Sequence, residues 1–131
     1  MKAKRISAVT LFVKDMKIST EFYSKIPGFR LVFGGTSSEF TTFEIGEKNK
    51  MHLNLELKKD KKKTDFGRII FHVDDVDEFY NLLKNDDYIS NLAVFENKPN
   101  DATWGERFFH IRDPDKYQLS FAMPLDINEI N

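Results

Sequence analysis

Apolar and polar residues alternate along several short segments of the chain, and this alternation is typical of β-strands that bury one face. In residues 51–57, leucines at every second position alternate with His52, Asn54 and Glu56. The same alternation, or a short run of β-branched and aromatic residues, predicts seven further strands. These strands cover residues 6–13, 29–33, 40–45, 67–73, 92–96, 106–112 and 117–123.

Two other segments carry apolar residues at helical spacing directly after an aspartate. Asp15 and Asp75 can each accept hydrogen bonds from the free N–H groups of a first helical turn. Pro27 and Gly28 then end the first helix. The apolar stripes consist of Ile18, Phe22 and Ile26 in the first segment and of Val76, Phe79, Tyr80 and Leu83 in the second. We therefore expect one amphipathic helix in each half of the chain.

The order strand, helix and three strands occurs twice, and parts of the sequence repeat with it. Residues 13–15 (VKD) return as residues 73–75 (VDD), and residues 21–23 (EFY) return as residues 78–80 (EFY). A chain rich in Lys and Phe can match itself by chance, but the common order of the matches favours a duplicated module. Duplication predicts two sheets that face each other across a cleft, where a functional site is expected.

The predicted modules cover residues 5–57 and 66–123, each with the order βαβββ, and a lysine-rich linker covers residues 58–65. Together they predict an α+β fold class in a single domain of residues 1–131. In each module the helix covers one face of the sheet, so the opposite face lines the cleft. The alternation assigns to the cleft Ala8, Thr10, Phe12, His52, Asn54, Glu56, Arg68, Ile70, His72, Gln118, Ser120 and Ala122.

Composition narrows the function classes by exclusion. Hydrophobic residues make up 40% and charged residues 31% of the chain, and the formal net charge is −1, which favours a globular protein without nucleic-acid or membrane partners. The absence of cysteine excludes a disulfide, a thiolate metal site and a thiol nucleophile. No aromatic residue interrupts the lysines of the linker, so we interpret them as solvated. We expect no signal peptide and no membrane span, and we predict a cytoplasmic location.

Residues 104–121 (WGERFFHIRDPDKYQLSF) resemble the closing segment of the vicinal oxygen chelate superfamily, which holds glyoxalase I, the bleomycin-resistance proteins and the extradiol dioxygenases. The beginning is similar to that superfamily as well, with VKD at residues 13–15, Phe22-Tyr23 on a helix and then Gly28-Phe29. The resemblance implies that the two modules form one cupped, eight-stranded mixed sheet, the glyoxalase/bleomycin-resistance fold. It also implies a homodimer.

One position departs from the family pattern. The family usually places glycine after the turn Asp113-Pro114-Asp115, and this chain has Lys116 there. We expect either a local change in the turn or a positive φ at Lys116, which costs energy for a residue with a Cβ atom.

The resemblance further implies four metal-ligand positions, which hold His, Glu or Gln in the superfamily's metal enzymes. In this chain the four positions are occupied by Ala8, Asn54, Arg68 and Ser120. Alanine has no ligand atom and arginine repels a cation, so we predict no metal ion and no cofactor. An alternative set of His52, Glu56 and His72 is disfavoured, because His52 and Glu56 lie about 13 Å apart along one strand.

Arg68 is the most specific candidate in the predicted cleft, since a guanidinium group can hold a carboxylate, phosphate or enolate-like oxygen through two parallel hydrogen bonds. The alternative is an internal ion pair between Arg68 and Glu56. Amide and hydroxyl groups can orient a ligand and aromatic rings can stack on it, although core packing is the alternative for each aromatic residue. The candidate ligand-binding residues are Arg68, Asn54, Glu56, Ser120, Gln118, His72, Phe12, Trp104 and Phe108. Arg107 is expected to pair with acidic neighbours on the outer sheet face.

These observations favour a metal-free small-molecule binding protein of the glyoxalase/bleomycin-resistance type, with its ligand in the cleft between the modules. A metal-dependent lyase, isomerase or dioxygenase of the same superfamily is the alternative. A metal-free catalyst with Arg68 as electrophile and His72 or Glu56 as base is a further hypothesis. The last hypothesis is a structural or regulatory interaction protein. The expected partners are a small-molecule ligand and a second copy of the chain.

Overall fold

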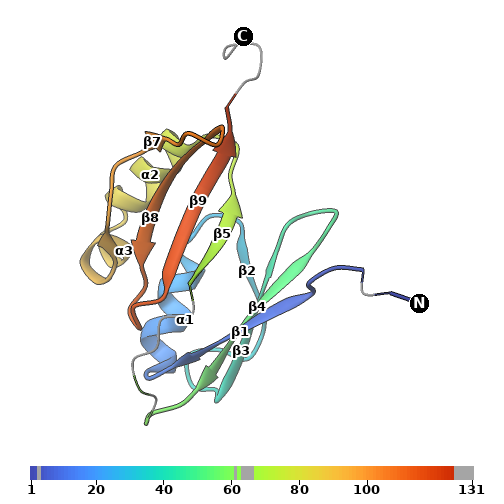
Figure 1. The fold of residues 1–131 in the computed structure, drawn as a ribbon. Helices are drawn as coiled ribbons and strands as arrows, with labels where there is room; N and C mark the ends of the chain where they lie inside the picture. Colours follow the sequence, from blue (N-terminus) through green and yellow to red (C-terminus); the bar gives the residue numbers. More distant parts are fainter. Residues whose placement is uncertain (3, 61, 63–66, 126–131) are drawn as a thin grey trace. The chain divides into compact units, whose positions relative to one another are not determined.

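The computed structural model describes residues 1–2, 4–60, 62 and 67–125 of the chain. It divides into two compact units, unit 1 with residues 1–62 and unit 2 with residues 63–131 (Figure 1). The cleft that the duplication predicts between the two modules stays a prediction. Residues 61 and 63–65 of the predicted linker lie outside the described residues.

Unit 1 is a four-stranded sheet with one helix. Its elements are β1 (Ala8–Val13), α1 (Met16–Ser24), β2 (Phe29–Phe33), β3 (Phe40–Ile45) and β4 (Met51–Leu57). The strand order is β1-β4-β3-β2, so β1 and β2 are the edge strands. β1 runs parallel to β4, and β4, β3 and β2 are antiparallel to their neighbours. The first and last strands of the unit therefore lie side by side, as Figure 1 shows.

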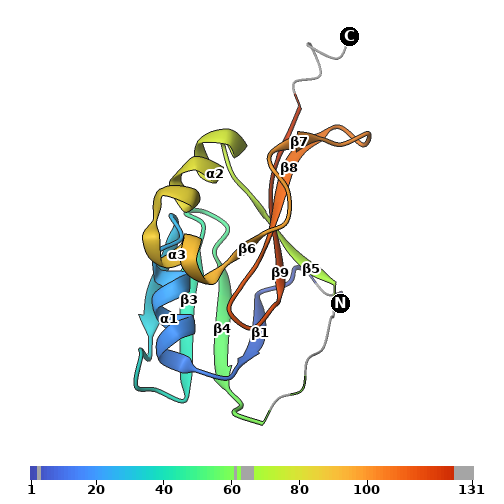
Figure 2. The same ribbon diagram turned by 90° about the vertical axis from the view of Figure 1, so that its left-hand side faces the viewer.

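Unit 2 repeats this arrangement with additions. Its elements are β5 (Arg68–His72), α2 (Val76–Asn85), α3 (Asp87–Leu92), β6 (Val94–Phe95), β7 (Asn100–Asp101), β8 (Glu106–Arg112) and β9 (Gln118–Pro124). The five-stranded sheet has the order β5-β9-β8-β6, and β7 also pairs with β8. β5 is parallel to β9, as β1 is to β4. Figure 2 shows α2 on one side of this sheet, and neither helix among the described residues of unit 2 lies on its other side.

The predicted α+β fold class is confirmed, and most strand bounds differ from the prediction by two residues or fewer. The strand predicted for residues 92–96 is the exception. Leu92 ends helix α3, and the strand contains Val94 and Phe95 alone. The physical reason is a third cap, because Asp86 Oδ1 accepts a hydrogen bond from Ile89 N at 3.0 Å and so starts a helix that the sequence analysis missed.

Both predicted helix caps are confirmed. Asp15 Oδ1 accepts from Ile18 N at 3.0 Å, and Asp75 Oδ1 accepts from Glu78 N at 3.0 Å. Each aspartate has an extended backbone and satisfies one of the N–H groups that a first helical turn leaves free. The two caps place α1 and α2 at equivalent points of the two units.

Aromatic residues fill both cores. In unit 1, Phe22 and Tyr23 of α1 are fully buried, and the ring of Tyr23 packs against Phe43 of β3. In unit 2, the repeated pair Phe79 and Tyr80 packs on β9 and β8, where Phe79 lies 4.8 Å from Phe121 and Tyr80 lies 5.1 Å from Phe109 between ring centroids. The repeated sequence therefore corresponds to a repeated packing of helix on sheet.

The turn before β9 confirms the second of the two expectations for Lys116. Its φ is +72°, the left-handed region that favours glycine. The buried carboxylate of Asp113 holds the turn, since its Oδ1 accepts from Asp115 N at 2.9 Å and from Tyr117 N at 2.8 Å. The turn thus keeps its form despite the missing glycine.

None of the helices in the described ranges has both the length and the apolar character that crossing a bilayer requires.

Candidate functional site

The sheet face opposite the helices, called the open face of each unit, carries the side chains that alternation assigned to the cleft. In β1, Leu11 and Val13 are buried whereas Ala8, Thr10 and Phe12 are exposed. In β5, the three residues Arg68, Ile70 and His72 are exposed and the two between them are half-buried. The predicted division of these strands into two faces is confirmed.

Strand β9 differs, because Ser120 and Ala122 are buried although they lie on the open face. β9 is an inner strand, and both of these side chains are small. Ser120 stands in register between Ile70 and His110, and Ala122 stands between His72 and Phe108. Larger residues flank both of them on β5 and β8, which makes Ser120 part of the floor of this face.

Asn54 occupies the centre of the open face of unit 1, and both ends of its amide are engaged. Asn54 Oδ1 accepts from Thr42 Oγ1 at 2.8 Å, and Asn54 Nδ2 donates to Thr10 Oγ1 at 3.3 Å. The three residues form a row across β1, β4 and β3. Asn54 is therefore held in one orientation by its neighbours.

Three basic side chains surround the carboxylate of Glu44, which lies next to the row of Asn54 on the open face of unit 1. Its carboxylate lies 2.9 Å from Arg30 Nη2, 3.5 Å from Lys50 Nζ and 3.4 Å from His52 Nε2. The hydrogen bond from Arg30 is the main cause that lowers the pKa of Glu44, with smaller contributions from Lys50 and His52. The carboxylate of Glu44 is thus already paired with basic side chains of its own unit.

Phe12 and Glu56 stand opposite each other at the far end of the same face. Phe12 is 41% exposed, and Lys58 Nζ lies 4.9 Å from its ring centroid. A cation at this distance interacts favourably with an aromatic face. Phe12 is consequently a surface residue of the open face and not part of the core.

Arg68 and Gln118 are brought together on the open face of unit 2. Arg68 Nε donates to Gln118 Oε1 at 2.9 Å, and Gln118 Nε2 donates to Glu96 Oε1 at 2.8 Å. Arg112 Nε approaches the other Glu96 oxygen at 3.2 Å. Burial raises the pKa of Glu96, but the contacts with Gln118 and Arg112 outweigh it and the pKa is lowered. Gln118 thus orients Arg68, while the ion pair of Arg68 with Glu56 stays a prediction.

Trp104, Phe108 and His72 gather at the other end of this face, around Glu106. Trp104 stacks on Phe108 with a centroid distance of 5.9 Å, and its Nε1 donates to Glu106 Oε1 at 2.9 Å. His72 Nε2 lies 3.4 Å from Glu106 Oε2. Trp104 remains 66% exposed, so most of its surface is available to a ligand.

His110 lies on the same face, and the sequence analysis missed it as a site residue. Its ring centroid is 4.8 Å from that of Phe108, and its Nδ1 is buried without a hydrogen-bond partner among the described residues. Burial is the main cause that lowers the pKa of His110; Arg68 and Arg112 lower it further, and Glu96 opposes them. The signal that could have found it is the alternation in β8, where Phe109 and Ile111 are buried and His110 between them is half-buried.

The four positions at which the resemblance implies metal ligands do not suit a divalent cation. Ala8 has no donor atom, and Arg68 is a cation bound to Gln118. The amide of Asn54 is engaged by two threonines, and Ser120 is only 3% exposed. Within the residues that the structure describes, no group of three or more His, Asp or Glu side chains could hold an ion.

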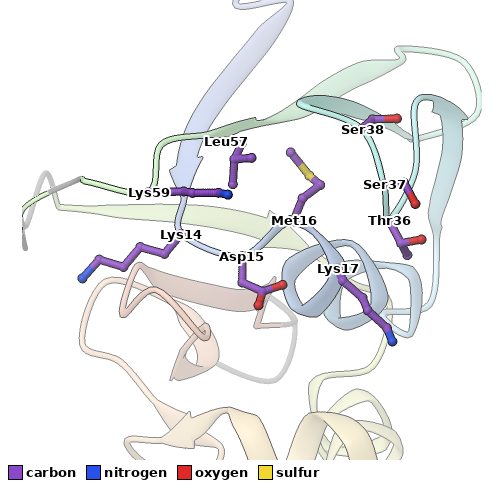
Figure 3. A pocket seen from close by; sticks show the side chains of 9 residues that line it. All are labelled: Lys14, Asp15, Met16, Lys17, Thr36, Ser37, Ser38, Leu57 and Lys59. Carbon is purple, nitrogen blue, oxygen red and sulfur yellow. The ribbon is translucent and has the colours of Figure 1, made fainter.

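A hollow of about 270 Å³ lies elsewhere in unit 1, where α1 begins (Figure 3). Its lining consists of Lys14, Asp15, Met16, Lys17, Thr36, Ser37, Ser38, Leu57 and Lys59. Figure 3 shows the side chains of Lys14 and Lys17 pointing to opposite sides, so they do not converge on one anion. Asp15 already places a carboxylate at the helix N-terminus. None of the predicted site residues lines this hollow.

Sequence comparison finds related proteins along most of the chain. The profile of the Glyoxalase/Bleomycin resistance protein/Dioxygenase superfamily matches residues 5–121. "Uncharacterized protein YraH" of Bacillus subtilis (strain 168) is 31% identical over 122 residues, which cover 85% of this chain and 91% of YraH.

Solved structures share the fold. A glyoxalase/bleomycin resistance protein/dioxygenase from Nocardioides matches with a TM-score of 0.73 at 17% identity, over 97% of this chain and 87% of that protein. A bleomycin resistance determinant encoded on the transposon Tn5 matches with a TM-score of 0.70 at 18% identity, over 92% and 98% of the two chains. At such identities the likeness establishes the fold alone.

Proposed function

Because the chain belongs to the Glyoxalase/Bleomycin resistance protein/Dioxygenase superfamily, we propose that it is a metal-free protein that binds a small organic molecule on its open sheet faces. Membership confirms the resemblance found in residues 104–121. One observation carries the proposal: where the superfamily's metal enzymes hold ligands, this chain has Arg68, whose Nε donates to Gln118. A fixed guanidinium group repels a cation and attracts an anionic group of a ligand.

The candidate residues divide into two roles on this proposal. Arg68, Trp104, Phe108 and His72 are exposed or half-exposed and contact the ligand. Gln118 orients Arg68, whereas Asn54 and Ser120 shape the floor of their faces. In unit 1, the ring of Phe12 and the carboxylate of Glu56 are the groups that meet the ligand, because both lie at the surface of β1 and β4.

A homodimer and a cytoplasmic location belong to the same proposal. Strand β2 supports the dimer, because it is an edge strand with Leu31, Val32 and Phe33 exposed. Edge strands with exposed apolar side chains readily pair with another chain. Light scattering coupled to size-exclusion chromatography measures the state directly, and a monomer across the micromolar range contradicts this part.

Metal analysis and thermal shift test the proposal together. We expect no stoichiometric metal in the purified protein and no stabilisation by Ni²⁺, Zn²⁺, Mn²⁺ or Fe²⁺. We expect a rise in melting temperature with at least one compound from a panel of metabolites and antibiotics, because binding to the native state stabilises it. Stoichiometric metal, or a metal-dependent rise of several degrees, contradicts the proposal.

A further inference from the structure

His110 has an unusual position for a histidine on an open sheet face. It stands on β8 in register with Ser120 of β9, which in turn stands opposite Ile70 of β5. One of its ring nitrogens, Nδ1, is buried and has no hydrogen-bond partner among the described residues. Its other nitrogen, Nε2, is not among the buried atoms that lack a hydrogen-bond partner. The Nδ1 edge of the ring is thus its buried edge, and Nε2 lies on the accessible edge, toward the open face.

The missing partner for Nδ1 determines where the imidazole carries its proton. Buried N–H groups without an acceptor are rarer in proteins than buried acceptors without a donor, so an unprotonated Nδ1 fits this site better than an N–H. A charged imidazolium would place an unpaired N–H at Nδ1 as well. This environment favours a neutral ring with its proton on Nε2, the form in which His110 presents a hydrogen-bond donor at its accessible edge.

The charges around His110 favour an anion near that donor. Arg68 and Arg112 both act electrostatically on His110, against a single carboxylate, Glu96. Glu96 is already occupied by Gln118 Nε2 at 2.8 Å and Arg112 Nε at 3.2 Å. Arg68 uses Nε for Gln118, and its two terminal nitrogens have no acceptor among the described residues of unit 2. Arg68 and His110 thus both offer N–H groups.

We infer that His110 is a further ligand-binding residue and that it donates from Nε2, together with the terminal N–H groups of Arg68, to an anionic oxygen of the ligand. The ligand class is therefore a small carboxylate or a comparable oxyanion. This inference rests on the proposed small-molecule binding and adds the charge and the hydrogen-bonding character of the ligand. A ligand group that only donates hydrogen bonds would leave both residues unpaired and is rejected.

Two probes of equal shape test the inference, namely benzoate and its neutral amide, benzamide. Titration of the ¹⁵N-labelled protein by NMR gives both dissociation constants and the residues that respond. We expect benzoate to bind at least about tenfold more tightly than benzamide, the effect of a charged hydrogen bond. We expect this preference to be lost in Arg68→Gln and reduced severalfold in His110→Phe, which keeps an aromatic ring without a donor.

Matched controls come from unit 1. Arg30→Gln and His52→Phe make the same changes of residue type next to Glu44, and we expect both to leave the preference for benzoate unchanged. Equal binding of benzamide and benzoate with signals shifting at Trp104 and Phe108 overturns the inference and leaves the proposed function standing. If no compound of the metabolite panel shifts any open-face signal, the proposed function itself fails.

A measurement without ligand keeps the inference falsifiable even if His110→Phe does not fold. Long-range ¹H–¹⁵N correlation spectra of the wild-type protein at pH 7 distinguish the two neutral forms of an imidazole from its cation. We expect the pattern of an Nε2-protonated neutral ring at His110. A proton on Nδ1, in the neutral or the charged form, overturns the inference.

Discussion

Arg107 of β8 and Asp77 in the first turn of α2 form a two-point ion pair, with Nε to Oδ2 at 2.8 Å and Nη2 to Oδ1 at 3.0 Å. Arg107 Nη1 also donates to Asp101 Oδ1 at 2.8 Å. The hydrogen bond from Arg107 is the main cause that lowers the pKa of Asp77. The pairing confirms the expectation that Arg107 meets acidic neighbours on the outer sheet face, the face that carries the helix. Arg107 there connects β8 to α2 through Asp77 and to β7 through Asp101.

We therefore expect Arg107→Lys to lower the free energy of unfolding, because an ammonium group cannot reproduce the planar fork. The loss should be about 1 kcal/mol, since the side chain of Asp77 is 53% exposed and solvent screens the pair. Urea unfolding measures it. Arg5→Lys, at an arginine whose contacts are a carbonyl and a thioether, is the control. Equal midpoints for Arg107→Lys and the wild type contradict the prediction.

Lys116→Gly should stabilise the protein by about 1 kcal/mol, because glycine adopts a positive φ without the steric cost that a Cβ atom brings. The carbonyl of Lys116, which accepts from Arg112 Nη1 at 3.1 Å, is retained in the variant. Differential scanning calorimetry measures the change. Lys116→Ala removes the same side chain and keeps the Cβ atom, so it should not stabilise. A gain of equal size in Lys116→Ala argues against backbone strain.

Asp113→Ala should lower the free energy of unfolding by about 2 kcal/mol or more. Asp113 is fully buried and accepts two backbone N–H groups, from Asp115 and Tyr117, which the variant leaves unpaired. Chemical denaturation measures the loss. Asp115→Ala changes a half-buried aspartate of the same turn and should cost less. Comparable stability of the two variants would show that the turn does not depend on the Asp113 carboxylate.

His110 should titrate below the usual histidine value of about 6.5. Burial is the main cause, Arg68 and Arg112 act in the same direction, and Glu96 opposes them. As the pH falls below about 6.5, the unfolded chain takes up this proton before the folded protein does. The contribution of His110 to stability is therefore fully present above that pH and declines from there toward the folded-state pKa. NMR titration of the imidazole protons measures the pKa.

The variant His110→Phe tests this pH dependence of stability separately. Its free energy of unfolding should decline less between pH 6.5 and pH 5 than that of the wild type, since the titrating group is gone. Unfolding at pH 8 gives the reference value for both proteins, because the imidazole of His110 is then neutral in the folded and in the unfolded wild-type protein. A pKa of His110 at or above 6.5 contradicts the assignment of a buried, neutral ring.

The candidate site could be predicted in part, for reasons that individual residues make clear. Alternation placed Arg68 and His72 on the open face, since a strand turns successive side chains to opposite sides. It applied equally to His110, but none of the four ligand positions that the resemblance implies lies on β8, and Phe108 was the one candidate on that strand. The contact between Arg68 and Gln118 needed the register of β5 on β9, which no local pattern contains.

Patterns read along the chain were sufficient for the strand periodicity, both helix caps and the repeated module, because each depends on residues within one turn or one strand. They also sufficed for the superfamily, which a continuous segment near the C-terminus reveals. Packing settled the rest. Ser120 is buried on an inner strand, burial and two arginines lower the pKa of His110, and Gln118 holds Arg68. These properties arise from residues up to 50 positions apart, as between Arg68 and Gln118, so they exist only once the strands are paired.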